Sequence, residues 1–218
     1  MKSYKAFIFD LNGTMIDDMA YHIKAWHEIF NRLGAPLTME ETKLQCYGKN
    51  GEVLERVFPG RFSEEEKDKM SIEKESAYQA AFRPHLNLID GLDIFIEKAF
   101  HSNIKMAIGS AAIMYNVNFV LDGLQLHNYF DVIVSADDVK ISKPDPETFL
   151  KCAGQLNILP ADCLVFEDSP KGSEAALRAA MDCVAITTMH TEAEFKQSNI
   201  IRFINDYNGH LFEEIIPG

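Results

Sequence analysis

The sequence lacks a long apolar run: no stretch approaches the roughly 18 consecutive apolar residues that a transmembrane helix needs. It also begins without the basic segment and long apolar stretch of a secretory signal peptide, because its first residues lead directly into a short apolar run that ends at Asp10. No fixed-period repeat and no low-complexity tract is present. We therefore expect a soluble, cytoplasmic, globular protein, and we expect it to be a monomer.

Positive charge is scarce, since 21 Lys and Arg face 33 Asp and Glu and the net charge is −12. Such a balance repels phosphate backbones and anionic lipid headgroups, so neither nucleic acid nor a membrane surface is an expected partner. An acidic protein can nevertheless bind an anionic substrate where a metal ion and a lysine reverse the local field. Phosphate chemistry is therefore not excluded.

Cofactor motifs are missing as well. The four cysteines are scattered, with no CxxC pair and no histidine at zinc-ligand spacing, which predicts reduced interior thiols. No GxGxxG follows the first apolar run and no P-loop occurs, which argues against a nicotinamide-cofactor enzyme.

Five short apolar runs alternate with helical patterns along most of the chain. The runs lie at 5–10, 104–108, 130–134, 163–166 and 183–186. They are continuous rather than alternating, as in parallel strands that are covered on both faces. The helical patterns lie at 92–100, 114–121, 146–156 and 170–180. This alternation predicts a doubly wound, Rossmann-like α/β sheet.

The interval from about 17 to 83 interrupts that rhythm, because it contains helical segments and no convincing strand. These segments lie at 21–33, 39–46, 52–58 and 63–82. Thr38 with Glu41, and Ser63 with Glu66, each match a capping box at a helix start. The sequence thus predicts an α/β core of residues 1–16 and 84–218, with an inserted α-helical cap domain over 17–83.

Polar and charged residues follow the apolar runs at the points where ligands bind to open parallel sheets, the carboxyl ends of the strands. They are Asp10, Asn12, Gly13 and Thr14 after the first run; Gly109 and Ser110 after the second; Lys143, Pro144 and Asp145 after the third; and Glu167, Asp168 and Ser169 after the fourth. Singly, each has a structural explanation, such as a helix cap or a solvated loop lysine. Their joint order favours one site of carboxylates, a hydroxyl and a lysine.

These motifs resemble, in order and spacing, those of the haloacid dehalogenase superfamily. DLNGT at 10–14 is similar to the family's first motif, Asp-x-Asp-x-Thr/Val. Ser110 in IGSA, Lys143 in SKPDPE and Glu167-Asp168 in FEDSPKG are similar to the second, third and fourth motifs. The helical insertion after the first motif resembles the family's small cap. Together with YHIKAW at 21–26, it points to the β-phosphoglucomutase subgroup and its related phosphatases.

The resemblance implies a Mg²⁺-dependent phosphatase acting on a small phosphorylated metabolite. Asp10 would be the nucleophile that forms an aspartyl-phosphate. Ser110 and Lys143 would hold the transferring group, which Thr14, Gly109 and Ala111 would help to bind. Mg²⁺ would be bound by four residues, Asp10, the backbone carbonyl of Asn12, Asp168 and, directly or through water, Glu167.

Asn12 departs from the family pattern, because the family's general acid and base is an aspartate at this position. An amide cannot transfer a proton, and losing general acid–base catalysis costs roughly 10²-fold to 10⁴-fold in rate. Asn12 is either a substitution of that aspartate or native. If it is native, the protein is a slow phosphatase or a non-catalytic binder of phosphorylated metabolites, and the sequence leaves these alternatives open.

The predicted cap carries two further candidates for substrate binding, Lys49 and His22. Lys49 lies in YGKNG, at the place of the subgroup's specificity loop, but Gly51 and Glu52 replace the arginine that a mutase would carry there. His22 either assists a substrate hydroxyl or acts as a hinge or packing residue.

The loop after Ser110 also bears on the reaction type. It continues with Ala111 and Ala112, without the lysine that the mutases carry there. The missing arginine of the cap loop and the missing lysine after Ser110 both favour hydrolysis over the phosphoryl transfer of a mutase. A β-phosphoglucomutase-type sugar-phosphate mutase remains the alternative enzyme.

Overall fold

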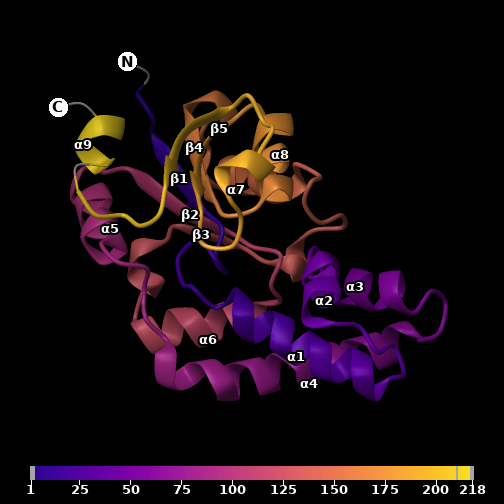
Figure 1. The fold of residues 1–218 in the computed structure, drawn as a ribbon. Helices are drawn as coiled ribbons and strands as arrows, with labels where there is room; N and C mark the ends of the chain where they lie inside the picture. Colours follow the sequence, from indigo (N-terminus) through magenta and orange to yellow (C-terminus); the bar gives the residue numbers. More distant parts are fainter. Residues whose placement is uncertain (1–2, 210, 217–218) are drawn as a thin grey trace. The chain divides into compact units, whose positions relative to one another are not determined.

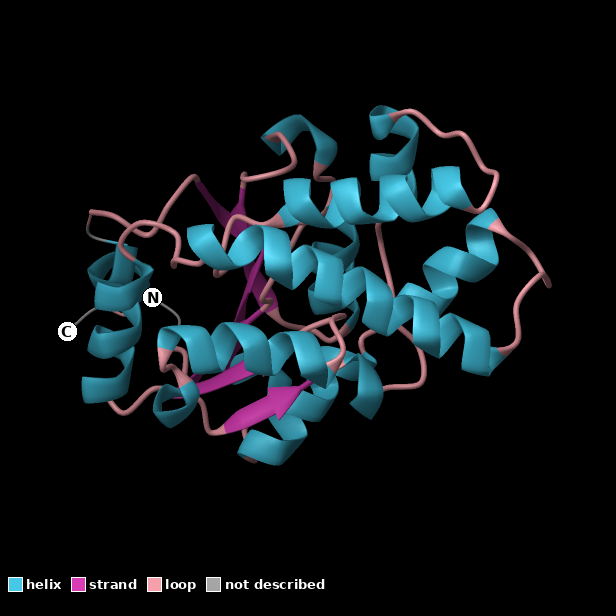
Figure 2. Cartoon of the chain, turned by 90° about the horizontal axis from the view of Figure 1, so that it is seen from below, coloured by secondary structure: helices cyan, strands magenta, loops and turns pink. Residues whose placement is uncertain are grey.

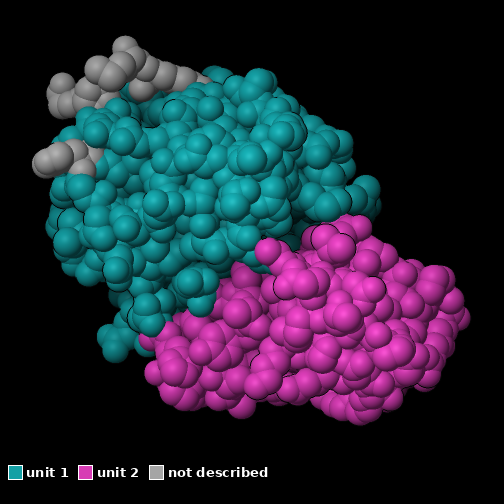
Figure 3. Space-filling model, in the orientation of Figure 1, with its two compact units in different colours: residues 1–17, 87–218 teal, residues 18–86 magenta. Residues whose placement is uncertain are grey.

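The computed structural model describes residues 3–209 and 211–216 (Figure 1). The outer ends of the predicted core, 1–2 and 217–218, lie outside this range, as does residue 210. The chain divides into two compact units, one of residues 1–17 and 87–218 and one of residues 18–86 (Figure 3). The second unit begins one residue later and ends three residues later than the predicted insertion at 17–83, because its last helix continues into a 3₁₀ turn at Arg83–His85.

The first unit is built on a six-stranded sheet of order β3-β2-β1-β4-β5-β6, in which every pairing is parallel. The strands are β1 (Ala6–Phe9), β2 (Lys105–Gly109), β3 (Val132–Val134), β4 (Cys163–Glu167), β5 (Asp182–Ile186) and β6 (Ile200–Ile204). The predicted doubly wound sheet and its five predicted strands are confirmed. Strand β6 was not predicted, because this edge strand carries Arg202 and exposed positions instead of a continuous buried run.

Helices cover both faces of the sheet (Figure 1). One face packs against α5 (Leu92–His101) and α9 (Leu211–Ile215), with Phe7 of β1 against Phe95 and Phe212. The other face packs against α7 (Glu147–Leu156) and α8 (Pro170–Arg178), with Ile8 in one core with Phe149 and Ala176. Successive strand residues point to opposite faces, so burial of both faces explains why the strands are continuous apolar runs.

Strand register aligns the ends of the three central strands. Phe9 of β1 lies opposite Ile108 of β2 and Phe166 of β4. The residues that follow, Asp10, Gly109 and Glu167, therefore reach the same edge of the sheet. The strand order also reverses at β1, with β2 on one side and β4 on the other, which is where doubly wound sheets bind their ligands.

Several short elements connect the layers of the first unit. Helix α6 (Met114–Leu124) follows the loop after β2. Short 3₁₀ segments lie at His127–Tyr129, Ala136–Asp138, Pro160–Asp162 and Glu192–Glu194.

The second unit consists of helices and the loops that join them, and all of its residues, 18–86, are described (Figure 2). Its helices are α1 (Met19–Arg32), α2 (Met39–Gln45), α3 (Asn50–Val57) and α4 (Glu64–Phe82). Both predicted capping boxes are confirmed, at Thr38 for α2 and at Ser63 for α4. Its core contains Trp26 stacked on Phe30.

The four cysteines are free thiols, as predicted. Cys152, Cys163 and Cys183 are buried and Cys46 is partly buried. Burial raises the pKa of Cys152 and Cys183 to about 12, which leaves them as inert thiols. Among residues 3–209 and 211–216, no helix is both long enough and apolar enough to cross a membrane.

Candidate active site

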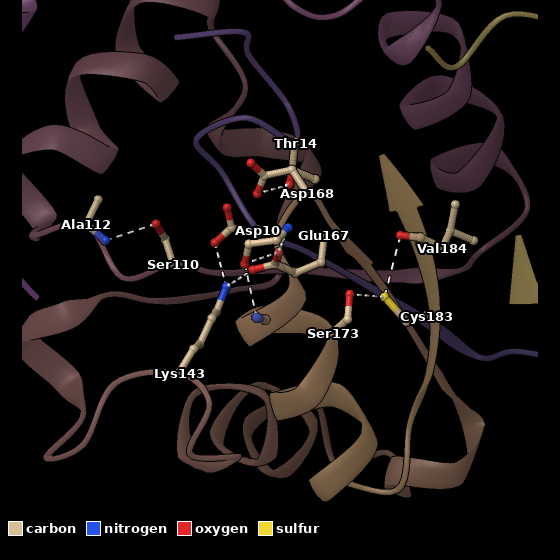
Figure 4. Close-up of polar contacts among 12 residues, drawn as sticks. Asp10, Thr14, Ser110, Ala112, Lys143, Glu167, Asp168, Ser173, Cys183 and Val184 are labelled. Carbon is tan, nitrogen blue, oxygen red and sulfur yellow. Dashed lines mark hydrogen bonds and ion pairs between the residues drawn. The ribbon is translucent and has the colours of Figure 1, made fainter. Parts of the chain in front are cut away.

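Asp10 directly follows β1 and is buried at the edge where the central strands end. Its backbone N–H donates to the Phe166 carbonyl, with an N···O distance of 2.9 Å, which extends the β1–β4 ladder by one residue. Its Oδ1 accepts a hydrogen bond from Lys143 Nζ at 2.6 Å (Figure 4). The Asp10 backbone is thus held by β4, and its carboxylate is paired with an ammonium.

Lys143 comes from the loop between β3 and α7, and it joins two carboxylates. Its Nζ lies 2.6 Å from Asp10 Oδ1 and 2.9 Å from Glu167 Oε1, with the side chain only 6% exposed. Burial alone would lower the pKa of this ammonium, but the two carboxylates outweigh burial and the pKa is raised. Lys143 therefore remains a cation at this site.

The loop that carries Lys143 is organised by the carboxylate of Glu147 at the start of α7. Its Oε2 accepts from the backbone N–H groups of Lys140, at 2.8 Å, and Ile141, at 3.1 Å. Its Oε1 pairs with Lys151 at 2.9 Å. This anchor fixes the loop two residues before Lys143.

Glu167 ends β4, and both of its carboxylate oxygens are engaged. Oε1 accepts from Lys143, while Oε2 accepts from the backbone N–H of Ser169 at 2.6 Å and from its hydroxyl at 2.9 Å. Ser169 Oγ accepts from Gly172 N at 3.0 Å and so caps α8, as a serine at this position commonly does. The start of α8 therefore holds Glu167 in place.

Asp168 is buried beside these groups, and Thr14 Oγ1 donates to its Oδ1 at 3.4 Å. Burial, followed by the neighbouring carboxylates of Glu167 and Asp10, raises its pKa well above the usual range. Asp10, Glu167 and Asp168 each offer an oxygen within 4.8 Å of the others. Fully ionised, the cluster has three negative charges against the one positive charge of Lys143.

This donor set fits a hard divalent cation. Mg²⁺ prefers carboxylate and carbonyl oxygens and retains waters, and buried negative charge in excess of its partners is costly unless a cation offsets it. The residues present can therefore hold such an ion, with Asp10 and Asp168 as direct carboxylate donors. Glu167 already uses both oxygens, which favours a contact through water.

The loop after Asp10 turns sharply before it leaves the first unit. Gly13 N donates to the Ile16 carbonyl at 2.8 Å, and Met15 N donates to the Leu11 carbonyl at 2.9 Å. Gly13 has a φ of 77°, which glycine adopts without the steric cost that a side chain brings. Asn12 lies in this loop and is half-buried.

Ser110 follows β2, and its backbone N–H donates to the Val134 carbonyl at 2.9 Å. Its Oγ accepts from Ala112 N at 3.1 Å, which shapes the loop that contains the half-buried Ala111 (Figure 4). Gly109 is the last residue of β2, and a Cβ there would lie 3.1 Å from Phe149. Close packing against α7 thus favours glycine at this strand end.

His22 belongs to the second unit, on α1, and is buried within a polar cluster. Its Nε2 lies 3.1 Å from Asp18 Oδ2, and its ring stacks on that of Tyr78 with centroids 3.8 Å apart. Lys74 Nζ contacts His22 Nδ1 and donates to Glu75 Oε1 at 3.0 Å. No role was predicted for Lys74 and Glu75, although they lie one helical turn before Tyr78 on α4.

Lys49 also belongs to the second unit, where it is the N-cap residue of α3. Its backbone N–H donates to Glu52 Oε2 at 3.1 Å. The structure thus brings Asp10, Thr14, Lys143, Glu167 and Asp168 together within the first unit. His22 and Lys49 are placed in the second.

The chain is similar to known proteins over most of its length. The family model described as haloacid dehalogenase-like hydrolase matches residues 7–186. Fructose-1-phosphate phosphatase YqaB of Escherichia coli is 30% identical over 183 residues, which cover 84% of this chain and 96% of that protein. β-Phosphoglucomutase of Bacillus subtilis is 30% identical over 190 residues, covering 84% of this chain and 83% of the relative.

A solved structure covers nearly the whole chain. A haloacid dehalogenase hydrolase of family IA, variant 3, from Entamoeba histolytica superposes with a TM-score of 0.87 at 28% identity. The alignment covers 99% of this chain and 98% of that one. The family match spans well over half of the sequence and contains β2 to β5 in full and β1 from its second residue. The chain belongs to the haloacid dehalogenase-like hydrolase family.

Proposed function

We propose that this protein is a Mg²⁺-dependent phosphatase that hydrolyses a small phosphorylated metabolite through an aspartyl-phosphate on Asp10. The observation that carries the proposal is the buried cluster at the end of β1. There Asp10 Oδ1 lies 2.6 Å from Lys143 Nζ, and Asp10, Glu167 and Asp168 each offer a carboxylate oxygen within 4.8 Å of the others. Two relatives, a fructose-1-phosphate phosphatase and a β-phosphoglucomutase, favour a sugar phosphate as the substrate.

In the first step an Asp10 carboxylate oxygen attacks phosphorus, an O–P bond to Asp10 forms and the bond between phosphorus and the ester oxygen breaks. The ester oxygen leaves with the bonding electron pair and takes its proton from water, because the Asn12 amide cannot donate one. Lys143 stays protonated, because its pKa is raised, and it offsets charge on Asp10 and on the transferring group. Ser110 is suited to donate its hydroxyl proton to a phosphoryl oxygen while its Oγ accepts from Ala112 N. Lys143 and Ser110 thus position the transferring phosphoryl group and stabilise its negative charge. Such positioning and charge stabilisation supply most of the catalysis in phosphoryl transfer.

The bound Mg²⁺ would be held by Asp10, Asp168, the backbone carbonyl of Asn12 and, through water, Glu167. It would supply positive charge against the phosphoryl oxygens. Thr14 orients Asp168 through its 3.4 Å hydrogen bond.

The second step needs a base to activate the water that cleaves the aspartyl-phosphate. An amide at position 12 cannot take that proton, so the phosphorylated enzyme turns over slowly. We further infer that the helical unit of residues 18–86 is the cap that selects the substrate, with His22 and Lys49 as its candidate contacts.

The first experiment measures phosphate release from a panel of sugar phosphates, including fructose 1-phosphate, with Mg²⁺. It compares the chain with its Asn12→Asp variant. Restoring the carboxylate should raise turnover by about 10²-fold to 10⁴-fold. The double variant Asp10→Asn/Asn12→Asp is the control, because it should lose activity if Asp10 is the nucleophile. Phosphate release from neither protein on any ester would overturn the phosphatase proposal.

A second experiment isolates the nucleophile. Acetyl phosphate has a leaving group that needs no protonation, so the chain with Asn12 should accumulate a phosphorylated Asp10, seen as one added phosphoryl group by mass spectrometry after acid quench. Asn12→Asp should clear that adduct. An adduct on another residue would contradict the proposed role of Asp10.

A sugar-phosphate mutase is the second candidate, favoured by the Bacillus subtilis relative. The absence of a lysine at Ala111 and Ala112 opposes it. A mutase would convert glucose 1-phosphate to glucose 6-phosphate without releasing phosphate. Binding of sugar phosphates without either reaction, after Asn12→Asp, would instead identify a non-catalytic binding protein.

A further inference from the structure

The loop after Asp10 is held by a set of hydrogen bonds that the family motifs do not include. Three consecutive backbone carbonyls of this loop each accept from a different part of the first unit. The pairs are Thr188 Oγ1 to the Gly13 carbonyl at 2.6 Å, Tyr207 OH to the Thr14 carbonyl at 3.1 Å, and Ile89 N to the Met15 carbonyl at 2.9 Å.

The two side-chain donors, Thr188 and Tyr207, follow strands near one edge of the sheet. Thr188 follows β5 and Tyr207 follows β6, the two outermost strands beyond β4. Tyr207 is 3% exposed, and its ring lies between those of Phe95 and Phe166, with centroid distances of 5.5 and 5.9 Å. A ring packed in this way has little freedom, so its hydroxyl is a rigid donor.

The need for such donors follows from Gly13. Glycine has no Cβ and rotates about φ and ψ more freely than any other residue, so the direction of its carbonyl is weakly specified by the backbone alone. The Gly13 φ of 77° also orients the peptide that joins it to Asn12, whose carbonyl is a proposed metal ligand. The Thr188 hydroxyl restrains the direction of the Gly13 carbonyl, at the opposite end of this residue from the Asn12 peptide.

We infer that Thr188 and Tyr207 are positioning residues that hold the loop of residues 11–16 in its metal-binding conformation. This rests on the proposed function in one respect, the use of the Asn12 carbonyl as a ligand. Neither side chain belongs to the donor cluster of Asp10, Glu167 and Asp168. Their effect is therefore on metal affinity, through the loop, and groups that orient metal ligands typically contribute 10-fold to 100-fold in affinity.

The neighbouring threonine provides a matched control. Thr187 lies one residue before Thr188, but its Oγ1 donates to the Ile204 carbonyl at 3.2 Å and to Asn205, both next to the end of β6. Thr187→Val and Thr188→Val thus make the same chemical change, the loss of one threonine hydroxyl, at adjacent positions. Only Thr188→Val removes the hydrogen bond to the Gly13 carbonyl.

The experiment titrates the full chain with Mn²⁺, followed by electron paramagnetic resonance, and with Mg²⁺, followed by calorimetry. Thr188→Val should weaken binding of either ion by about 10-fold or more. Thr187→Val should change binding less than about threefold, and Thr188→Ser, which keeps the hydroxyl, should restore it to the level of the unchanged chain. Tyr207→Phe should weaken binding in the same direction.

Equal Mn²⁺ affinities for Thr187→Val and Thr188→Val would overturn the inference. Thermal unfolding without metal checks that each variant is folded, and Thr188→Ala provides the same readout if the valine disrupts packing. The titrations involve no substrate. A failure of phosphate release therefore bears on the proposed hydrolysis alone, whereas equal affinities overturn the positioning role, together with the Asn12 carbonyl as a ligand, and leave hydrolysis untouched.

Discussion

Gly172 in the first turn of α8 leaves no space for a side chain beside Glu167. A Cβ at Gly172 would lie 1.8 Å from Glu167 Oε1 and 1.9 Å from its Cδ. The carboxylate in question is buried and bonded to both Lys143 and Ser169, so it cannot move aside without breaking those contacts. The first turn of α8 and the position of the Glu167 carboxylate therefore both depend on a glycine at position 172.

We accordingly predict that Gly172→Ala displaces Glu167 and weakens the ion pair with Lys143. The free energy of unfolding should fall by about 1–3 kcal/mol, the usual cost of overpacking, and turnover of Asn12→Asp should fall more than about 10-fold. Denaturant unfolding and phosphate release measure the two effects.

Gly154 in α7 is the matched control. A Cβ there has no neighbour within 4 Å among the described residues. Gly154→Ala should thus be neutral or stabilising by about 0.5–1 kcal/mol, since alanine is the better helix former. Equal effects of the two substitutions would contradict the role assigned to Gly172.

Removal of the Lys143 ammonium should be costly for both stability and activity. Lys143→Met leaves Asp10 and Glu167 buried without their cation, and breaking a buried pair in this way costs about 3–5 kcal/mol of unfolding free energy. Turnover of Asn12→Asp should fall by about 10²-fold to 10³-fold. Lys140→Met, on the exposed part of the same loop, should leave both quantities nearly unchanged. Comparable losses in the two variants would refute this assignment.

Mg²⁺ should stabilise the fold through its site. At a free concentration of 100 times the dissociation constant, Mg²⁺ should raise the unfolding free energy by about 2.7 kcal/mol, and excess chelator should reverse the shift. Asp168→Asn removes one carboxylate of the cluster and should abolish most of that gain. Asp68→Asn, exposed on α4 of the other unit, should retain it. Thermal scans with and without Mg²⁺ test the prediction, which fails if Asp168→Asn gains as much stability as the unchanged chain.

The Glu147 carboxyl gives a prediction about pH. Lys151 and the backbone N–H groups of Ile141 and Lys140 hold its pKa at about 2, below the ordinary value of 4.5. Because the folded state binds this proton more weakly than the unfolded state, the carboxylate stabilises the fold above pH 4.5, and that stabilisation is lost as the pH falls toward 2.

Glu147→Gln should therefore lower the melting temperature at neutral pH, and its difference from the unchanged chain should narrow between about pH 4.5 and pH 2. Thermal melts across that range measure the difference, and Glu97→Gln, exposed on α5, is the control. A difference in melting temperature between Glu147→Gln and the unchanged chain that stays constant with pH would show that Glu147 does not act through its charge.

The central strands and the charged residues that follow them were predictable from the sequence. A strand buried on both faces is apolar along its length, so the apolar runs that form β1 (Ala6–Phe9) and the first four residues of β4 (163–166) were visible without a structure. The residues directly after such strands necessarily gather at one edge of a parallel sheet. For that reason Asp10 and Glu167 could be assigned to one site together.

The tertiary structure decided what local pattern cannot encode. Strand β6 was hidden because an edge strand is half-exposed, and Thr188 and Tyr207 follow the two strands that lie farthest from β1 on that side of the sheet. Their bonds to Gly13 and Thr14 join residues 175 and 193 positions apart in the sequence. Likewise, the contact of Gly172 with Glu167 depends on the angle at which α8 leaves β4. Composition and periodicity determine which residues are buried, whereas the order and register of the strands determine which buried residues meet.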